Sequence, residues 1–203
     1  MDINHPAEIK IHRYLSDVRN GKRGMSDATI ARIVADVKTS LEKQFEKRSK
    51  NKFSLRMSSI GRPYCQLWFE KNDPEGAIEP SANFLMNMLI GDIVEAVFKG
   101  ILSESNVTFS DGFKSVLKVT GEEIPGTHDL IMDNKVDDIK SASPWSYTNK
   151  FKDFNTLAES DPFGYVGQLV GYSKALGVDI GGWWVINKAT GEFKYVSAAE
   201  ADT

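Results

Sequence analysis

Asp129, Asp138 and Lys140 bring two carboxylates and one ammonium group into a short stretch of the chain. The segment KVDDIKSAS has the composition of a strand, and the strand period of two places Val136, Asp138 and Lys140 on one face. The segment before it, GTHDLIMD, leads into a turn at Asp133–Asn134. We therefore expect Asp129 to lie near Asp138 across a hairpin.

These residue types suit the metal-assisted hydrolysis of a phosphate ester. Two carboxylates about 4 Å apart repel by roughly 4 kcal/mol at an effective dielectric of about 20, which favours a bound cation or a shared proton. Mg²⁺ binds oxygen atoms of carboxylates, waters and phosphates. Lys140 could then stabilise or deprotonate the attacking water, or neutralise charge on the phosphate. The alternative is a surface hairpin decorated by Asp133, Asp137 and Asp138, with Lys140 as a weak ion-pair partner.

Helices are predicted on both sides of these strands. Apolar residues at helical spacing indicate a helix over 27–48, capped by Ser26 or Asp27. A short helix is expected after the turn at 61–63 and a long helix over 81–103. A further helix is expected over 162–177, opened by Pro162 and closed by Gly177. The predicted strands cover 112–120, 126–133, 135–143, 181–187 and 192–198, with turns at Gly121, Gly126 and Asp133–Asn134.

This order of elements predicts an α/β or α+β domain with a central mixed β-sheet flanked by helices. The length of 203 residues fits a single domain, in which residues 1–80 form a helical, basic portion and residues 81–203 the catalytic core. No Gly-rich phosphate loop follows a predicted strand, which argues against an enzyme driven by a nucleotide.

Composition limits the function classes further. The hydrophobic fraction of 41% and the charged fraction of 26% are those of an ordinary globular protein. The N-terminal sequence has no signal-peptide pattern and the apolar runs are short, so we expect a cytoplasmic protein without a membrane partner. Cys65, the single cysteine, cannot form an internal disulfide or by itself build a zinc or iron–sulfur site.

A formal net charge of −3 hides a strongly basic stretch. The ordinary interpretation of such a stretch is a solvated helix end and loop. It becomes a candidate DNA-binding surface only beside a site that cuts DNA. Its members are Lys43, Lys47, Arg48, Lys50, Lys52, Arg56 and Arg62.

Four motifs occur in an order that resembles the PD-(D/E)XK nuclease superfamily, in particular its RecB-like and lambda-exonuclease-like branch. In that branch a helix with an acidic residue precedes a strand with Asp, a strand with (D/E)xK and a helix with QxxxY. The resemblance covers residues 91–177, and His128 stands where the family usually has proline. The matching residues are Glu95 in GDIVEAV, Asp129 in GTHDLI, Asp138 and Lys140 in DDIK, and Gln168 and Tyr172 in GQLVGY.

The resemblance implies a restriction-endonuclease-like core that binds Mg²⁺ or Mn²⁺. The implied metal ligands are Glu95, Asp129, Asp138 and the backbone carbonyl of Ile139, while Lys140 assists the attack of water. Glu95 has an alternative interpretation, because Asp92, Glu95 and Lys99 share the polar side of an amphipathic helix and could form a solvated face.

The resemblance also implies contacts with DNA. Gln168 and Tyr172 lie on one helical face and would bind DNA or brace the site, although Tyr172 could also be a half-buried residue bonded to a neighbour. SSIGRPYCQLWFEKN resembles the N-terminal part of CRISPR-associated RecB-like exonucleases, but the C-terminal cysteines are absent, so we expect no iron–sulfur cluster and a core position for Cys65. Further DNA contacts are expected from Arg48, Lys50, Lys52, Arg56, Arg62 and Ser58 or Ser59.

The function that this sequence favours is a metal-dependent exonuclease that acts on DNA ends in recombination, repair or phage replication. One alternative is a structure-specific endonuclease such as a junction resolvase. Another is a nucleic-acid-binding protein that keeps the nuclease fold without turnover, although pure binding would need neither Asp138 nor Lys140. The sequence leaves the cleavage polarity and the oligomeric state open, including a homo-oligomer.

Overall fold

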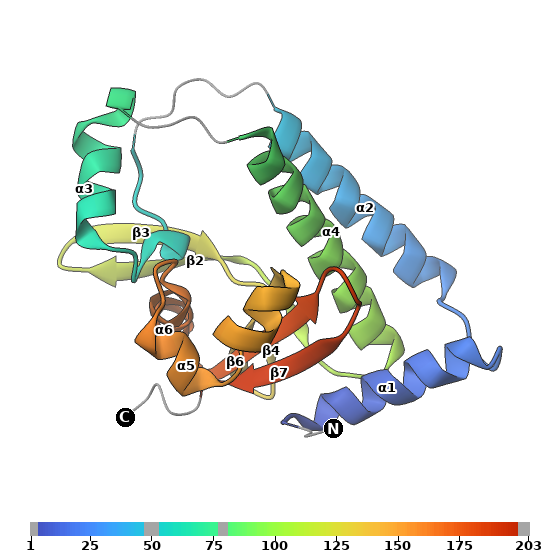
Figure 1. Cartoon of the computed structure of the whole chain (residues 1–203). Helices are drawn as coiled ribbons and strands as arrows, with labels where there is room; N and C mark the ends of the chain where they lie inside the picture. Colours follow the sequence, from blue (N-terminus) through green and yellow to red (C-terminus); the bar gives the residue numbers. More distant parts are fainter. Residues whose placement is uncertain (1–3, 47–52, 77–80, 199–203) are drawn as a thin grey trace.

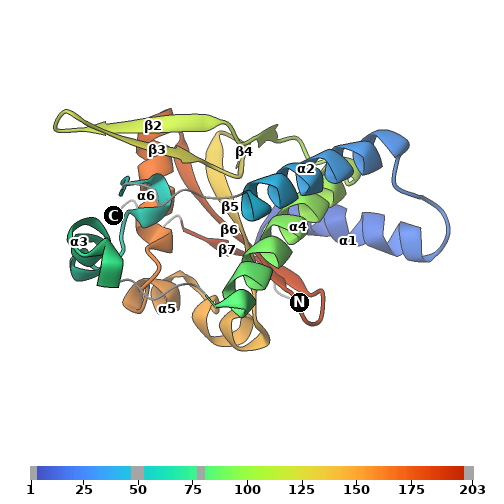
Figure 2. The ribbon, with the colours of Figure 1, turned by 90° about the horizontal axis from the view of Figure 1, so that it is seen from above.

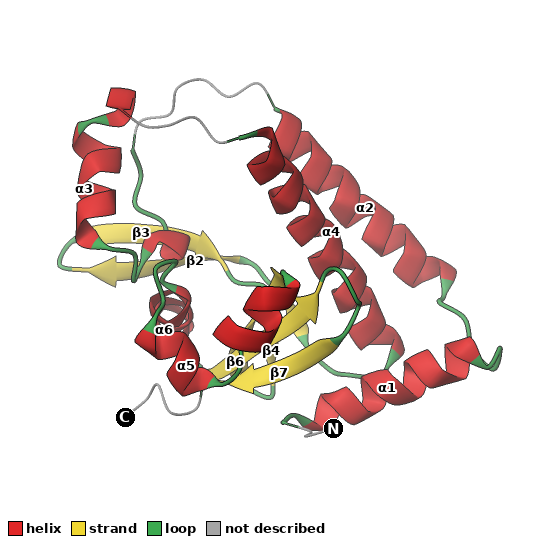
Figure 3. Cartoon of the chain, in the orientation of Figure 1, coloured by secondary structure: helices red, strands yellow, loops and turns green. Residues whose placement is uncertain are grey.

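The computed structural model describes residues 4–46, 53–76 and 81–198, and it folds as helices packed on both faces of a mixed sheet (Figures 1 and 3). The helices are α1 Pro6–Arg19, α2 Asp27–Phe45, α3 Tyr64–Asn72, α4 Ala82–Glu104, α5 Phe154–Glu159 and α6 Tyr165–Leu176, with short turns η1 Met57–Ser59, η2 Pro74–Gly76 and η3 Ser146–Lys150. The strands are β1 Ser110–Asp111, β2 Lys114–Val119, β3 Glu122–Thr127, β4 Leu130–Met132, β5 Lys135–Ala142, β6 Asp179–Asn187 and β7 Phe193–Ser197.

The main sheet has five strands in the order β1-β4-β5-β6-β7. Strands β5 and β6 are parallel, and the other neighbouring pairs are antiparallel. Strands β2 and β3 form a separate antiparallel hairpin. A central mixed sheet flanked by helices is the predicted fold class, and the structure confirms it.

Each face of the main sheet has its own apolar core. On one face α6 and η1 pack against the sheet around Trp183, Val136 and Leu169. On the other face α1 and α4 pack around Trp184 and Phe98. Helix α2 lies outside α4 as a further layer, as Figures 1 and 2 show. None of the helices in the described ranges is long and apolar enough to cross a membrane.

The hairpin between β4 and β5 turns at Asp133 and Asn134, both of which have positive φ. Two consecutive residues of this kind form the tight turn that matches the twist of a two-stranded hairpin. The register pairs Leu130 with Asp137, so Asp129 comes opposite the segment that begins at Asp138. The predicted turn and the predicted approach of these two aspartates are confirmed.

The start of α6 packs closely against the backbone that follows η1. A methyl group at Gly164 would lie 2.3 Å from the Ile60 carbonyl oxygen, and one at Gly167 would lie 2.9 Å from Gly61 Cα. Such distances exclude a side chain, so glycine is what lets the two segments touch. The prediction that Pro162 opens this helix is wrong, because α6 begins after Gly164, whose φ is +73°.

The predicted strand over 126–133 and the predicted turn at Gly126 are also wrong. The segment 126–133 is not one strand, because residues up to Thr127 belong to β3 and β4 starts only at Leu130. Gly126 is therefore not a turn but a strand residue paired with Ser115. The turn at Gly121 is confirmed by its φ of +87°.

Helix α1 was not predicted from apolar periodicity. It starts at an unusual cap, because the His5 side chain accepts a hydrogen bond from the Ala7 N–H at 3.1 Å. Glu8 Oε1 accepts a hydrogen bond from the Tyr195 N–H at 3.1 Å, and Asn4 Nδ2 donates to the Tyr195 carbonyl at 3.2 Å. These bonds attach α1 to the outer edge of β7.

Candidate functional site

The candidate site lies in a cleft of about 840 Å³ at the start of β4 and along the second half of β5. Helices α3, α4 and α6 form its walls, and the sheet forms its floor. Several of the predicted residues line this cleft, namely Glu95, Asp129, Asp138, Ile139, Lys140, Arg62 and Gln168. The other lining residues are Ser58, Gln66, Glu70, Phe84, Met88, Gly91, Asp92, Ser141, Pro162, Phe163 and Tyr165.

Asp129, Asp138 and Lys140 meet on the floor of this cleft. Lys140 Nζ lies 2.5 Å from Asp138 Oδ2, and the Ile139 N–H donates to Asp129 Oδ2 at 2.7 Å. In an extended strand the N–H and C=O of one residue point to the same edge. The Ile139 carbonyl therefore points to the edge where Asp129 lies. The alternative of a surface hairpin is wrong, because Asp138 is buried.

Burial raises the pKa of both carboxylates on the floor of the cleft. Burial, followed by the charge of Asp138, raises the pKa of Asp129 to about 6. Burial also raises the pKa of Asp138, opposed by Lys140. For Lys140 burial lowers the pKa, but the charges of Asp138 and Asp129 outweigh that effect and raise it above the usual value. Lys140 therefore stays cationic at neutral pH and compensates the two carboxylates.

Glu95 approaches this group from α4, but its carboxylate is engaged by another residue. Lys99 Nζ donates to Glu95 Oε1 at 2.6 Å, one helical turn away, and lies 3.9 Å from Asp111. Burial and the charge of Asp129 raise the pKa of Glu95 to about 7. A fully solvated face is excluded because the Lys99 side chain is buried. The predicted role of Glu95 as a metal ligand stays a prediction.

The donor set on the floor of the cleft fits a hard divalent cation. Asp129, Asp138 and the Ile139 carbonyl offer only oxygen atoms, and their number meets what Mg²⁺ requires of a protein beside waters and phosphate. Within the described ranges no three acidic, histidine or cysteine side chains lie close enough to enclose a metal ion. The fit therefore rests on two carboxylates and one carbonyl, with Glu95 bonded to Lys99.

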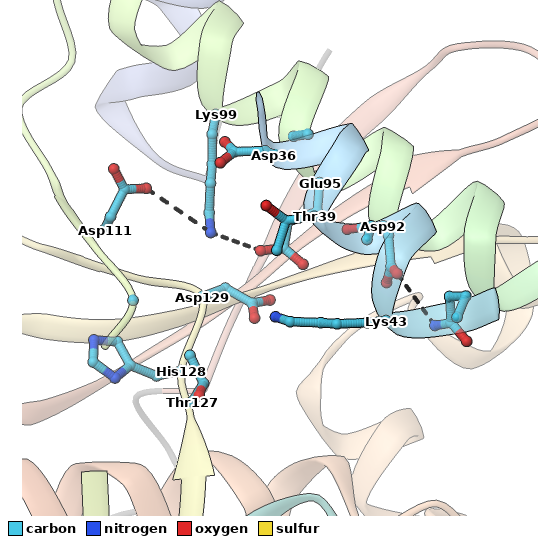
Figure 4. Close-up of a pocket in the computed structure, with 14 residues that line it drawn as sticks. Asp36, Thr39, Lys43, Asp92, Glu95, Lys99, Asp111, Thr127, His128 and Asp129 are labelled. Atoms are coloured by element: carbon cyan, nitrogen blue, oxygen red, sulfur yellow. Dashed lines mark hydrogen bonds and ion pairs between the residues drawn. The ribbon is translucent and has the colours of Figure 1, made fainter. Parts of the chain in front are cut away.

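A second hollow of about 560 Å³ lies behind the first and shares Asp92, Glu95 and Asp129 with it. Helix α2 forms its outer wall. Figure 4 shows Lys43 of α2 extending toward Asp129, and Lys99 lying between Asp111 and Glu95. The two hollows follow one another along the same face of α4 and meet at Asp92, Glu95 and Asp129.

The predicted DNA contacts divide into three groups. Arg62 and Gln168 line the cleft, and Arg56 lines an adjoining hollow of about 420 Å³. Ser59 is buried, and Ser58 is the serine that lines both hollows. The remaining predicted contacts, Arg48, Lys50 and Lys52, lie outside the described residues.

Tyr172 braces the site. Its side chain is only 3% exposed, and its hydroxyl donates to the Thr127 carbonyl at 2.7 Å, just before Asp129 in the chain. Next to it, His128 is buried, and its ring packs edge-on against Phe113 and Tyr172. Burial lowers the pKa of His128, so a neutral imidazole fills this position.

Sequence reasoning missed Tyr165, which lies at the site, and gave Cys65 a wrong position. The Tyr165 ring lies 4.9 Å from Lys140 Nζ. Its position three residues before Gln168, on the same face of α6, is the signal that would have identified it. Cys65 was predicted in the core, but it is exposed on α3. No residue of α3 is buried, so this helix has no core position for a small apolar side chain.

Comparisons with known proteins assign no family. The sequence matches no model of a protein family, and no curated protein matches it. Among solved structures, the chain is similar to one described as "Crystal structure of SSO0001", with a TM-score of 0.48 and 18% sequence identity. The match covers 81% of this chain and 76% of that chain. No family or function follows from a likeness at this level.

Proposed function

We propose that this chain is a Mg²⁺- or Mn²⁺-dependent deoxyribonuclease of the PD-(D/E)XK type that hydrolyses phosphodiester bonds at DNA ends. The observation that carries the proposal is the contact of Lys140 with Asp138 beside Asp129, on the floor of a cleft. The buried carboxylates and the compensating ammonium group suit a site where a divalent cation and a phosphate come together.

Asp129, Asp138 and the Ile139 carbonyl would hold the cation. The cation supplies charge neutralisation at the phosphate and lowers the pKa of the attacking water. Because its pKa is raised, Lys140 keeps its proton and donates hydrogen bonds to the oxygens on which negative charge grows. Tyr172 acts as a positioning residue through the Thr127 carbonyl.

Several polar side chains beside the catalytic residues suit the binding of a DNA backbone. Arg62 and Gln168 line the cleft, and Arg56 and Lys114 line the adjoining hollow. Ser58 and Gln168 line both, so the two hollows lie side by side. Arginine, lysine, serine and glutamine are residue types that commonly contact phosphate oxygens.

The test is cleavage of end-labelled linear DNA, single- and double-stranded, with Mg²⁺, Mn²⁺ or EDTA, beside a covalently closed circle. We expect loss of label from the linear substrates with either cation and resistance of the circle. Asp138→Asn should be inactive while keeping the circular dichroism spectrum of the wild-type protein. Cleavage of the circle would select an endonuclease, and absence of cleavage with both cations would contradict the proposal.

A further inference from the structure

A hollow of about 400 Å³ adjoins the cleft and is not part of the proposed catalytic centre. It lies between η3 and the segment that joins α5 to α6. Pro162 and Phe163 line both this hollow and the cleft, so the two lie side by side. Its other lining residues are Trp145, Ser146, Asn149, Lys150, Thr156 and Ser160.

Two large aromatic side chains are left open to solvent in this hollow. Trp145 is 68% exposed and Phe163 is 56% exposed. Single exposed aromatic residues are ordinary. Two of them that line one hollow beside the cleft form a surface that suits a flat ring. The backbone under Trp145 is held in place, because Asn149 Nδ2 donates to the Trp145 carbonyl at 3.0 Å.

A stack of rings connects this hollow with Lys140. Phe163 and Tyr165 are stacked, with centroids 5.6 Å apart and planes 15° apart. Tyr165 in turn lies 4.9 Å from Lys140 Nζ. A planar group resting on Phe163 would therefore be two aromatic rings away from the proposed catalytic lysine.

The charge of the hollow points to the class of ligand. Lys150 Nζ lies 4.3 Å from the Phe163 centroid and 4.6 Å from the Tyr165 centroid. Among the described residues that line the hollow, Lys150 alone is charged. Aromatic faces beside a cation are the combination that binds a single nucleic acid strand, in which bases stack on rings and phosphates contact basic groups.

We propose that Phe163 and Trp145 form a subsite that stacks unpaired bases of single-stranded DNA next to the catalytic centre, with Lys150 binding the adjoining phosphate. The subsite rests on the proposed function, because it assigns the substrate of that same cleft. Base pairs inside a duplex present only their edges, so these rings can stack a base only where it is unpaired or at the very end of the strand. The substrate class is DNA with a single-stranded end.

Stacking is measured directly with single-stranded oligonucleotides that carry 2-aminopurine at one position near either end, whose fluorescence is quenched by stacking. Titrations in EDTA report binding without cleavage. We expect quenching by the wild-type protein. Phe163→Ala and Trp145→Ala should lose the quenching and weaken binding by roughly 5- to 150-fold, the range of base–aromatic stacking. Phe163→Tyr and Trp145→Phe should restore both.

Phe69→Ala is the matched control, because Phe69 is also 56% exposed but does not line the hollow. It should bind as the wild-type protein does, and a duplex that carries 2-aminopurine at an internal position should give no further quenching. The subsite would be overturned if both alanine variants bound with wild-type affinity, or if Phe69→Ala lost as much affinity as they do. A change in oligomeric state on removal of the rings would overturn it as well. So would failure of the wild-type protein to bind single strands.

The same samples separate this inference from the proposed function. Quenching that depends on Phe163 and Trp145, without cleavage in Mg²⁺ or Mn²⁺, contradicts the nuclease and supports the subsite. Cleavage with wild-type quenching in both alanine variants supports the nuclease and contradicts the subsite.

Discussion

At the scale of single residues, Lys140 is the cation that makes the floor of the cleft stable without a metal ion. Its ammonium group contacts Asp138 and lies under the face of Tyr165. A buried carboxylate that loses its partner is costly, whereas an intact buried pair is close to neutral for stability. The same group can therefore serve the stability of the apoprotein and, in the proposed reaction, the transition state.

Lys140→Met tests the catalytic part of this role. The variant keeps much of the side-chain length but cannot donate hydrogen bonds, so we expect single-turnover cleavage to fall by about 10² to 10³-fold. Binding of single-stranded DNA in EDTA should persist. Lys118→Met is the control, because Lys118 pairs with Glu123 on the exposed β2–β3 hairpin. A wild-type single-turnover rate in Lys140→Met would remove this lysine from the mechanism.

Asp129→Asn tests whether the carboxylates are destabilising in the absence of a cation. The fold raises the pKa of Asp129 from 3.8 to about 6, so the contribution of this group to stability is complete below pH 3.8 and is lost as the pH rises through about 6. At pH 8 in EDTA the variant should be more stable by about 1 to 3 kcal/mol, by urea denaturation. Mg²⁺ should stabilise only the wild-type protein. Equal responses to Mg²⁺ would contradict a cation site at Asp129.

The sequence was informative about residues that a strand period and a tight turn bring together. Asp138 and Lys140 share a face, and the Asp133–Asn134 turn returns the chain so that Asp129 is opposite them. The pairing of Glu95 with Lys99 agrees with their spacing of four on one helix, but the burial of this pair near Asp129 was not predictable, because it depends on how α4 packs against the sheet.

At the scale of elements, α1 begins at a cap that depends on protonation. His5 Nδ1 accepts a hydrogen bond from the Ala7 N–H, which requires the unprotonated nitrogen. Burial lowers the pKa of His5, and the imidazole packs against the rings of Trp184 and Tyr195. A protonated imidazole would lose the cap and place a positive charge at the positive end of the helix dipole.

His5→Asn tests this pH dependence, because asparagine caps a helix and does not titrate. The lowered pKa of His5 makes its contribution to stability complete above its ordinary value of 6.5, and that contribution is lost as the pH falls through the lowered value. Between pH 7.5 and pH 5 the wild-type protein should therefore lose more stability than His5→Asn. Comparing the two proteins cancels the titration of all other groups. Parallel pH profiles in urea denaturation would show that the cap does not titrate.

Strand β3 and helix α1 were not predicted, because each has a residue that is uncommon in such an element. Strand β3 contains Pro125, which is tolerated because this hairpin has only two strands and a proline can face outward. Helix α1 is capped by His5, and histidine is not among the preferred capping residues. The long amphipathic helices α2 and α4 were predicted closely, because their apolar spacing is sustained over many turns.

At the scale of the whole molecule, the net charge of −3 does not describe the surface that the proposed substrate would meet. Lys43 lines the second hollow from α2, Arg56 lines the hollow beside Ser58, and Lys150 lies beside Phe163. Cations therefore line three hollows that adjoin the cleft. This arrangement depends on contacts between distant segments, which is why sequence reasoning could name the basic stretch but not its position.

Salt dependence measures this arrangement. Neutralising Lys43 and Arg56 together, as Lys43→Gln and Arg56→Gln, should lower the slope of log affinity against log salt by about one unit for each phosphate that the variant no longer neutralises. Binding should weaken equally for unrelated sequences. Lys38→Gln is the control on the same helix, because Lys38 is exposed and pairs with Glu42. An unchanged slope in the double variant would return these residues to an ordinary solvated surface.

The hydrogen bond between Glu8 and Tyr195 joins residues 187 positions apart in the chain. During synthesis at about 5 to 20 residues per second, α1 emerges roughly 10 to 40 s before its partner strand exists. Over that time Ala7 and Ile11, which share one apolar core with Tyr195 in the folded protein, can pack against α4 but not against β7. The core on this face of the sheet therefore closes late, because a helix made early must wait for a strand that is made about 170 residues afterwards.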